Sequence, residues 1–279
     1  MASKHIGICR LCKQECQLKE SHIVPKLFYN LIKKNSPTGR FRNANNPNIP
    51  YQDGEKLPFL CGECEEKFSK YETYFSKNIY QSFSQSYGIK GFESKGNEIG
   101  YFALSIAWRT LKYSMEMGIK NLSKKEYAQI DIVLEKWRNA LFHEDFNNIS
   151  MIKQYIVPTT YLNYFSDMQT RIISNVCGDF KVYGKEDEFC AAYTTVQVPY
   201  LIFVSMAWGE EVLLHNYEVG KRIIPNDIEL PETLVWQLNL LHKQKFGEAN
   251  QAMSDEQRVK ITQMICKNLG IVAPGERHE

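Results

Sequence analysis

Residues 9–26 read CRLCKQECQLKESHIVPK and open with the first of two Cys-x-x-Cys pairs in the chain. The four cysteines of the two pairs are Cys9, Cys12, Cys61 and Cys64. Each pair presents two thiolates on one tight turn, which is the spacing that a tetrahedral zinc ion requires. The pairs therefore predict one structural zinc site with four sulfur ligands. The segment between them contains a single histidine, His22, and the zinc site would hold it in a fixed place.

Composition places the chain among globular proteins. Of its 279 residues, 43% are hydrophobic and 13% aromatic, which excludes a disordered chain. The formal net charge is only +2, so affinity for nucleic acid would have to come from local basic clusters. We find no signal peptide and no run of 18 apolar residues, and we therefore expect a cytoplasmic protein without a membrane segment.

The remaining cysteines are not spaced as metal ligands. In a reducing compartment eight cysteines are not expected to form four disulfides. Cys177, Cys190 and Cys266 lie among apolar or strand-like residues and are interpreted as buried thiols. Cys16 is open to two interpretations, a substitute ligand or an ordinary core or loop residue. We favour the second, because four better-spaced thiols already complete the site.

The first part of the chain is cysteine-rich and contains short periodic segments. Apolar residues at helical spacing predict helices over residues 24–34 and 65–83. Residues 39–54 carry asparagines, two prolines and an Asp-Gly pair, which predict a loop. We expect a zinc-binding module over residues 1–83.

Residues 84–279 have a different pattern. Glycines over residues 88–100 indicate a hinge, and no glycine-rich nucleotide-binding motif is present, so we expect no nucleotide cofactor. The expected helices cover residues 101–117, 127–142, 231–244 and 254–269, the second of them after a Ser123–Glu126 capping box; the expected strands cover residues 171–182, 189–204 and 212–215. The aromatic stretch 193–208 is interpreted as a sheet core, with a ligand pocket or an interface as the alternative. The predicted fold class is α+β, a small ββα zinc module followed by a larger mixed domain.

The order of motifs in the first quarter of the chain resembles the zinc-containing HNH nucleases of the His-Me finger (ββα-metal) group. The resemblance rests on the first Cys-x-x-Cys pair, then SHIVPK at residues 21–26, then LCGECE at residues 60–65. It implies a treble-clef-like core in which His22, followed by Pro25, is the general base. It also implies a separate catalytic ion, Mg²⁺ or Mn²⁺, beside the structural zinc, and hydrolysis of phosphodiester bonds in DNA, or alternatively RNA.

The chain departs from the family pattern at three positions. Ser21 stands where the family usually has Asp or His as a ligand of the catalytic metal. The family's asparagine would fall near Lys56, and Asp53, Glu55 or Asn48 would serve in another loop register. Glu65 follows the last cysteine, where His or Asn is common, and its carboxylate suits Mg²⁺.

The leading hypothesis is a metal-dependent endonuclease, with bacterial restriction or antiviral defence as the context that the resemblance implies. Lys26, Arg40 and Arg42 are expected to contact phosphates. Residues 84–279 would serve target recognition, regulation or homo-oligomerisation. The alternative, favoured by the departures, is a non-catalytic zinc finger that binds nucleic acid or a protein partner.

Overall fold

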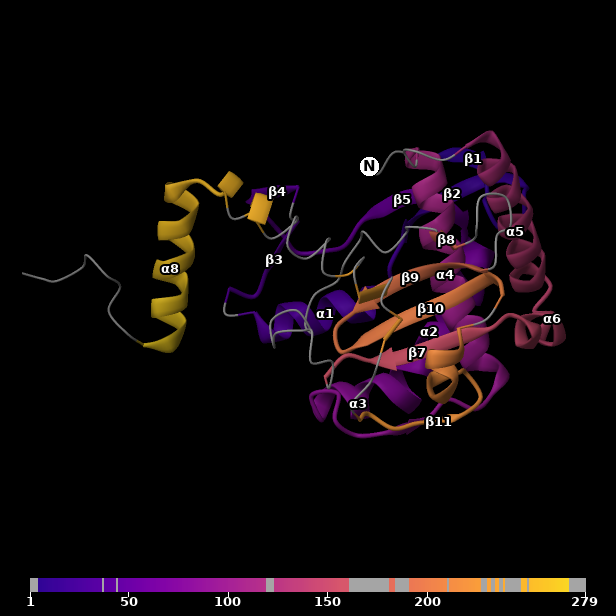
Figure 1. Ribbon diagram of the computed structural model, residues 1–279. Coiled ribbons are helices and arrows are strands. Elements are labelled where there is room, and N and C mark those ends of the chain that lie inside the picture. Colours follow the sequence, from indigo (N-terminus) through magenta and orange to yellow (C-terminus); the bar gives the residue numbers. More distant parts are fainter. Residues whose placement is uncertain are drawn as a thin grey trace, which may run out of the picture.

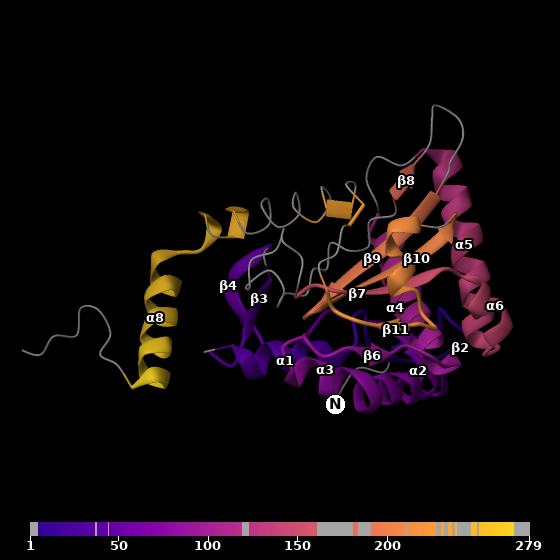
Figure 2. The same ribbon diagram turned by 60° about the horizontal axis from the view of Figure 1, so that its bottom comes forward.

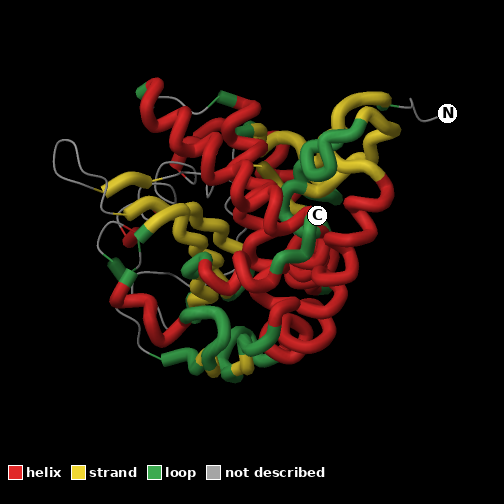
Figure 3. The backbone as a smooth tube through the Cα atoms, turned by 90° about the vertical axis from the view of Figure 1, so that its right-hand side faces the viewer, coloured by secondary structure: helices red, strands yellow, loops and turns green. Residues whose placement is uncertain are grey.

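The computed structural model describes the greater part of the chain. The described residues are 5–36, 38–43, 45–118, 123–160, 181–183, 191–209, 211–226, 230–231, 234–235, 238, 247–249 and 251–270. They form a mixed α+β fold of helices and small antiparallel sheets, which confirms the predicted fold class. Helices line one side of the largest sheet (Figure 3).

The cysteine pairs lie on a three-stranded antiparallel sheet followed by a helix. Its strands, in the order β1-β2-β5, are β1 (Ile6–Ile8), β2 (Glu15–His22) and β5 (Lys56–Cys61). Strand β5 leads directly into α2 (Gly62–Phe75). The order strand β2, strand β5, helix α2 places His22 at the end of one strand and the second cysteine pair at the end of the other.

A helix and a hairpin are inserted between β2 and β5. The helix is α1 (Lys26–Asn35), as predicted, and the hairpin consists of β3 (Phe41–Asn43) and β4 (Asn46–Tyr51). The prediction of a loop over residues 39–54 was therefore wrong for its central part. A two-stranded ribbon has only edge strands, and these tolerate proline. In Figures 1 and 2 the hairpin stands out from the body beside α1.

The helices that follow pack on one another. Helix α2 continues through the π-helical turn η1 (Ser76–Tyr80) into α3 (Gln81–Gln85), so the helix predicted over residues 65–83 is confirmed. The other helices are α4 (Asn97–Met117), α5 (Lys124–Phe142) and α6 (Phe146–Met151). The capping box of α5 is present as predicted, with reciprocal bonds between Ser123 and Glu126. Part of the expected hinge instead forms β6 (Phe92–Glu93) and the first turn of α4.

The largest sheet has the strand order β7-β10-β9-β8 and is antiparallel. Its strands are β7 (Gln154–Pro158), β8 (Lys181–Tyr183), β9 (Ala191–Val198) and β10 (Leu201–Trp208). The strand expected over residues 189–204 is thus split by a tight turn, in which Tyr200 has a φ of 68°. The strand expected over residues 212–215 is instead the 3-10 helix η3 (Val212–Tyr217), and most of residues 171–182 lie outside the described residues.

The two faces of this sheet pack against different partners. One face, represented by Phe203, packs on the helices, and the other, represented by Ile202, packs on residues of η3 and of β11 (Arg222–Ile223). Both residues are at most 1% exposed, which confirms a sheet core over most of residues 193–208.

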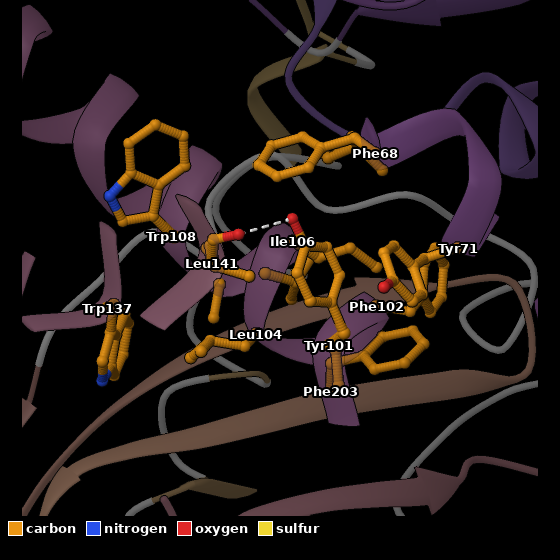
Figure 4. Close-up of a cluster of buried hydrophobic side chains, with 14 of the residues drawn as sticks. Phe68, Tyr71, Tyr101, Phe102, Leu104, Ile106, Trp108, Trp137, Leu141 and Phe203 are labelled. Carbon is orange, nitrogen blue, oxygen red and sulfur yellow. Dashed lines mark hydrogen bonds between the residues drawn. The ribbon is translucent and has the colours of Figure 1, made fainter. Parts of the chain in front are cut away.

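The main hydrophobic core runs from the zinc-type cysteines to the largest sheet. One cluster of buried side chains extends from Cys9 to Phe203. Figure 4 shows its centre, where Tyr71 of α2 stacks on Tyr101 of α4 at 3.8 Å between ring centroids and the Tyr101 hydroxyl donates to the Leu141 carbonyl. The core does not break at residues 83 and 84, and the domain division there stays a prediction.

The last described helix, α8 (Asp255–Leu269), begins after Ser254, whose side chain accepts a hydrogen bond from Gln257 as expected. Asn48 of the hairpin bonds to the segment that precedes α8. Its side chain accepts a hydrogen bond from the Ser254 amide and donates one to the Ala252 carbonyl. Most of the helix expected over residues 231–244, together with Cys177 and Cys190, lies outside the described residues. None of the described helices is long and apolar enough to cross a membrane.

Candidate metal centre and the histidine beside it

The four predicted cysteines converge at one point. The first pair follows β1 in a turn closed by two backbone bonds, from the Cys9 amide to the Gln14 carbonyl and from the Lys13 amide to the Cys9 carbonyl. The second pair spans the end of β5 and the first turn of α2. The four sulfur atoms lie within 4.8 Å of one another, so these cysteines are positioned to hold a metal ion.

The donor set fits a tetrahedral thiolate site. The Cys12 and Cys61 sulfurs are 3.9 Å apart, and zinc–sulfur bonds of about 2.3 Å place the sulfurs of a tetrahedron about 3.8 Å apart. The Cys9 sulfur also accepts a hydrogen bond from the Cys61 amide. Cys16 is not a member of the cluster; its thiol donates to the Gln14 carbonyl, which agrees with the favoured interpretation.

The pKa values of two of the clustered thiols are shifted by their proximity to each other. A hydrogen bond from Cys64 lowers the pKa of Cys9 to about 4. The same bond, together with burial, raises the pKa of Cys64. Metal ligands must be deprotonated, and a bound cation would stabilise both thiolates.

His22 is fixed by a carboxylate. Its Nε2 lies 2.7 Å from Oδ1 of Asp53, in the loop just before β5. Asp53 also forms an ion pair with Lys56. Burial raises the pKa of Asp53, but the bonds from Lys56 and His22 outweigh burial and hold that pKa below its ordinary value. Asp53 is thus a carboxylate anion beside the ring.

The backbone of His22 is fixed by a residue from the second part of the chain. Arg109 of α4, which is 1% exposed, donates from Nη1 to the His22 carbonyl at 3.1 Å. Its Nη2 forms an ion pair with Glu72 of α2 at 2.8 Å. Sequence reasoning missed Arg109. The available signal was an arginine directly after Trp108, in the part of residues 101–117 that is otherwise mostly apolar.

Ser21, which stands where the resemblance would place a ligand of the catalytic ion, bonds the strand backbone. It is 1% exposed, accepts a hydrogen bond from the Leu60 amide and donates to the Lys19 carbonyl. The pairing of β2 with β5 shifts register next to Lys19, and the Ser21 hydroxyl bonds the strand backbone there. Its oxygen is thus used within the sheet.

Glu65 lies in the first turn of α2, and one of its carboxylate oxygens is buried without a hydrogen bond. Among the described residues, the four cysteines are the one group of at least three His, Cys, Asp or Glu side chains close enough to hold a metal. No such group joins Glu65 to His22, so the role of Glu65 as a ligand of a catalytic ion stays a prediction.

The three basic residues expected to contact phosphate lie on the insertion between β2 and β5. Lys26 begins α1 and is exposed, and Arg40 is exposed just before β3. Arg42 lies within β3 and donates from Nη1 to the Pro47 carbonyl at 2.8 Å, which holds the hairpin together. Their contact with nucleic acid stays a prediction.

The loop that carries Asp53 depends on a glycine. A Cβ atom on Gly54 would lie 2.2 Å from ring carbons of Tyr29, which is itself buried. We expect Gly54→Ala to lower the free energy of unfolding by about 1–3 kcal/mol, because the ring or the loop must shift. Urea denaturation measures this. Gly62→Ala is the control, since its Cβ would make only an ordinary contact with Lys19; equal stability of the two variants would contradict the packing.

Asp53 also gives a pH-dependent contribution to stability. Its pKa is lower in the folded protein, so its stabilisation is present above the unfolded value, about 3.9, and is lost as the pH falls towards the folded value. We expect Asp53→Asn to cost about 1–2 kcal/mol at pH 7 and less at pH 3. Thermal unfolding across this range checks the difference. Asp131→Asn, at an exposed site on α5, should show no such trend, and a pH-independent loss in Asp53→Asn would refute the linkage.

Comparison of the chain with models of known protein families, with curated proteins and with solved structures found no match in any of the three.

Proposed function

We propose that this protein is a zinc-stabilised, metal-dependent endonuclease of the HNH type that hydrolyses phosphodiester bonds. The observation that carries the proposal is the placement of His22. His22 is the last residue of strand β2, and its ring is bonded to Asp53. The four clustered cysteines connect the turn after β1 with the end of β5 and the start of α2. We take the ion of the cysteine cluster to be zinc, which prefers four thiolates in closed structural sites.

The hydrogen bond from the His22 ring to Asp53 uses Nε2 and leaves Nδ1 to accept a proton. Because Asp53 accepts from Nε2–H of His22, the lone pair of the neutral ring lies on Nδ1. In the described part of the chain Nδ1 has no hydrogen-bond partner, so it is the atom that would take a proton from an attacking water. Asp53 would then stabilise the resulting imidazolium.

A second divalent ion, Mg²⁺ or Mn²⁺, would supply positive charge to the phosphate when bound. Such ions are held by one or two carboxylates together with water and substrate oxygens. Asp53 is the carboxylate in contact with His22, and Glu65 is the further candidate from the sequence. The side chain of Lys56, which is paired with Asp53, adds positive charge near the ring.

The proposal is tested with supercoiled plasmid, single-stranded DNA and RNA incubated with the purified protein. We expect cleavage with Mg²⁺ or Mn²⁺ and none without an added ion. Inertness on every substrate with both ions would overturn the enzyme assignment.

One observation favours a second candidate, a non-catalytic zinc finger that binds nucleic acid or a protein partner. The Ser21 hydroxyl is used inside the sheet, and no group of three metal-ligand side chains includes His22 among the described residues. This candidate predicts binding of a partner without cleavage and equal behaviour of the wild type and a His22 variant.

A further inference from the structure

The insertion between His22 and Asp53 is strongly basic for this chain. Residues 26–52 contain five Lys or Arg residues and no Asp or Glu, whereas the net charge of the whole chain is only +2. The segment forms α1 and the β3–β4 hairpin. Both of its ends lie at the candidate site, because His22 precedes α1 and Asp53 follows β4.

Most of these charges have no counterion among the described residues. In the part of the chain that the structure describes, no hydrogen bond or ion pair is formed by the side chains of Lys26, Lys33, Lys34 and Arg40. Surface cations in a folded protein commonly pair with neighbouring carboxylates, and this segment has none. A polyanion is the ligand that such a surface fits.

Aromatic rings connect this basic segment with the histidine. The Tyr29 ring lies 6.4 Å from the His22 ring and 5.3 Å from Phe41, between centroids. Phe41 in turn pairs across the hairpin with Tyr51, with centroids 6.4 Å apart and planes inclined by 22°. Tyr29 is buried, whereas Phe41 and Tyr51 are half-buried and are not enclosed in the core.

The combination of half-buried rings with cations that have no counterion among the described residues favours single strands over duplexes. In a duplex the faces of the bases are covered by their neighbours, whereas an unpaired base offers a free face to an aromatic side chain. Cations beside the rings then hold the phosphates of the same strand. The hairpin that carries Phe41 and Tyr51 stands out from the body beside α1 (Figure 2).

Building on the proposed function, we propose that α1 and the β3–β4 hairpin bind single-stranded nucleic acid. Bases stack on Tyr51 and on the exposed part of Phe41, and phosphates contact Lys33, Lys34 and Arg40. The substrate of the His22 site is therefore a single strand or an unpaired segment rather than an intact duplex.

Binding is measured by fluorescence anisotropy of a labelled 20-nucleotide strand and of the same sequence as a duplex, in buffer without Mg²⁺ or Mn²⁺. We expect the single strand to bind at least about 10-fold more tightly. Tyr51→Leu should weaken single-strand binding roughly 5- to 150-fold, the range for removing one stacking ring, and Tyr51→Phe should restore it. Tyr87→Leu, at an exposed tyrosine outside the segment, is the matched control.

The charge contribution is measured in the same assay as a salt dependence. Replacing Lys33 and Lys34 by Gln should lower the slope of log K against log salt by about 0.7 for each phosphate that the protein no longer neutralises. Lys136→Gln, on the exposed face of α5, should leave the slope unchanged.

Equal or tighter binding of the duplex, no measurable binding, or an unchanged affinity of Tyr51→Leu would overturn the inference. These outcomes are separate from the fate of the endonuclease. Single-strand binding without cleavage would support the binding surface and refute the proposed endonuclease activity. Cleavage at the same rate in the wild type and in Tyr51→Leu would support the endonuclease activity and refute the binding surface.

Discussion

His22→Ala is expected to lower the rate of metal-dependent cleavage by at least about 100-fold, because general-base catalysis by a positioned side chain contributes about 10²–10⁴. The variant loses the ring nitrogen that takes the proton, while Asp53 and Lys56 keep their mutual ion pair. Cleavage is followed under single-turnover conditions, so that the chemical step rather than product release is measured.

Two controls make the His22 result specific. His143→Ala, at an exposed position after α5, should cleave at the wild-type rate. The metal content of His22→Ala should equal that of the wild type, since His22 is not a member of the cysteine cluster. Cleavage that persists in His22→Ala at the wild-type rate would place the base elsewhere or reveal a contaminating nuclease.

Local patterns were enough to predict most helices and the metal cluster. The Ser123–Glu126 box fixed the start of α5 because both of its hydrogen bonds are formed within four residues. The two cysteine pairs predicted the cluster because each turn sets the spacing of its own two thiols. Such features depend on neighbours in the sequence and need no knowledge of the tertiary fold.

The parts that the sequence did not predict depend on distant partners. Residues 212–215 have the composition of a strand, yet they form a 3-10 helix, and the Glu211 amide just before it donates to the Tyr155 hydroxyl, 56 residues away in the sequence. The hairpin within residues 39–54 was obscured by its prolines, which edge strands tolerate, and its Asn48 bonds to the Ala252 carbonyl and the Ser254 amide. In each case the propensity of the segment was overridden by its surroundings.

His22 was predicted from a local sequence pattern, but its contacts come from residues far away in the sequence. Its position in the motif order was visible in the sequence, but its partners were not. Asp53 lies 31 residues away and Arg109 lies 87 residues away. The Arg109 bond also links the second part of the chain to the site, a dependence that the pattern of motifs in the first quarter cannot show.

Cys64→Ser is expected to abolish metal binding and to unfold the β2–β5–α2 unit. Zinc binding in small structural sites contributes about 10–16 kcal/mol in apparent terms, which equals or exceeds the whole stability of a typical domain. Cys64 lies at the start of α2 and is 4% exposed, so a serine there leaves a hard, poorly binding oxygen in a buried position.

The measurement is the metal content per chain by mass spectrometry, together with thermal unfolding. We expect about one zinc in the wild type and none in Cys64→Ser, with a melting temperature lower by at least about 10 °C, since each kcal/mol shifts a chain of this size by about 2–4 °C. Cys16→Ser is the matched control, because Cys16 lies on β2 outside the cluster and should keep both the zinc and the stability. If Cys64→Ser retained zinc while Cys16→Ser did not, the ligand set would have to be reassigned. Stability that is indifferent to both changes would mean that the hydrophobic core shared by α2 and α4, rather than an ion, holds His22 in place.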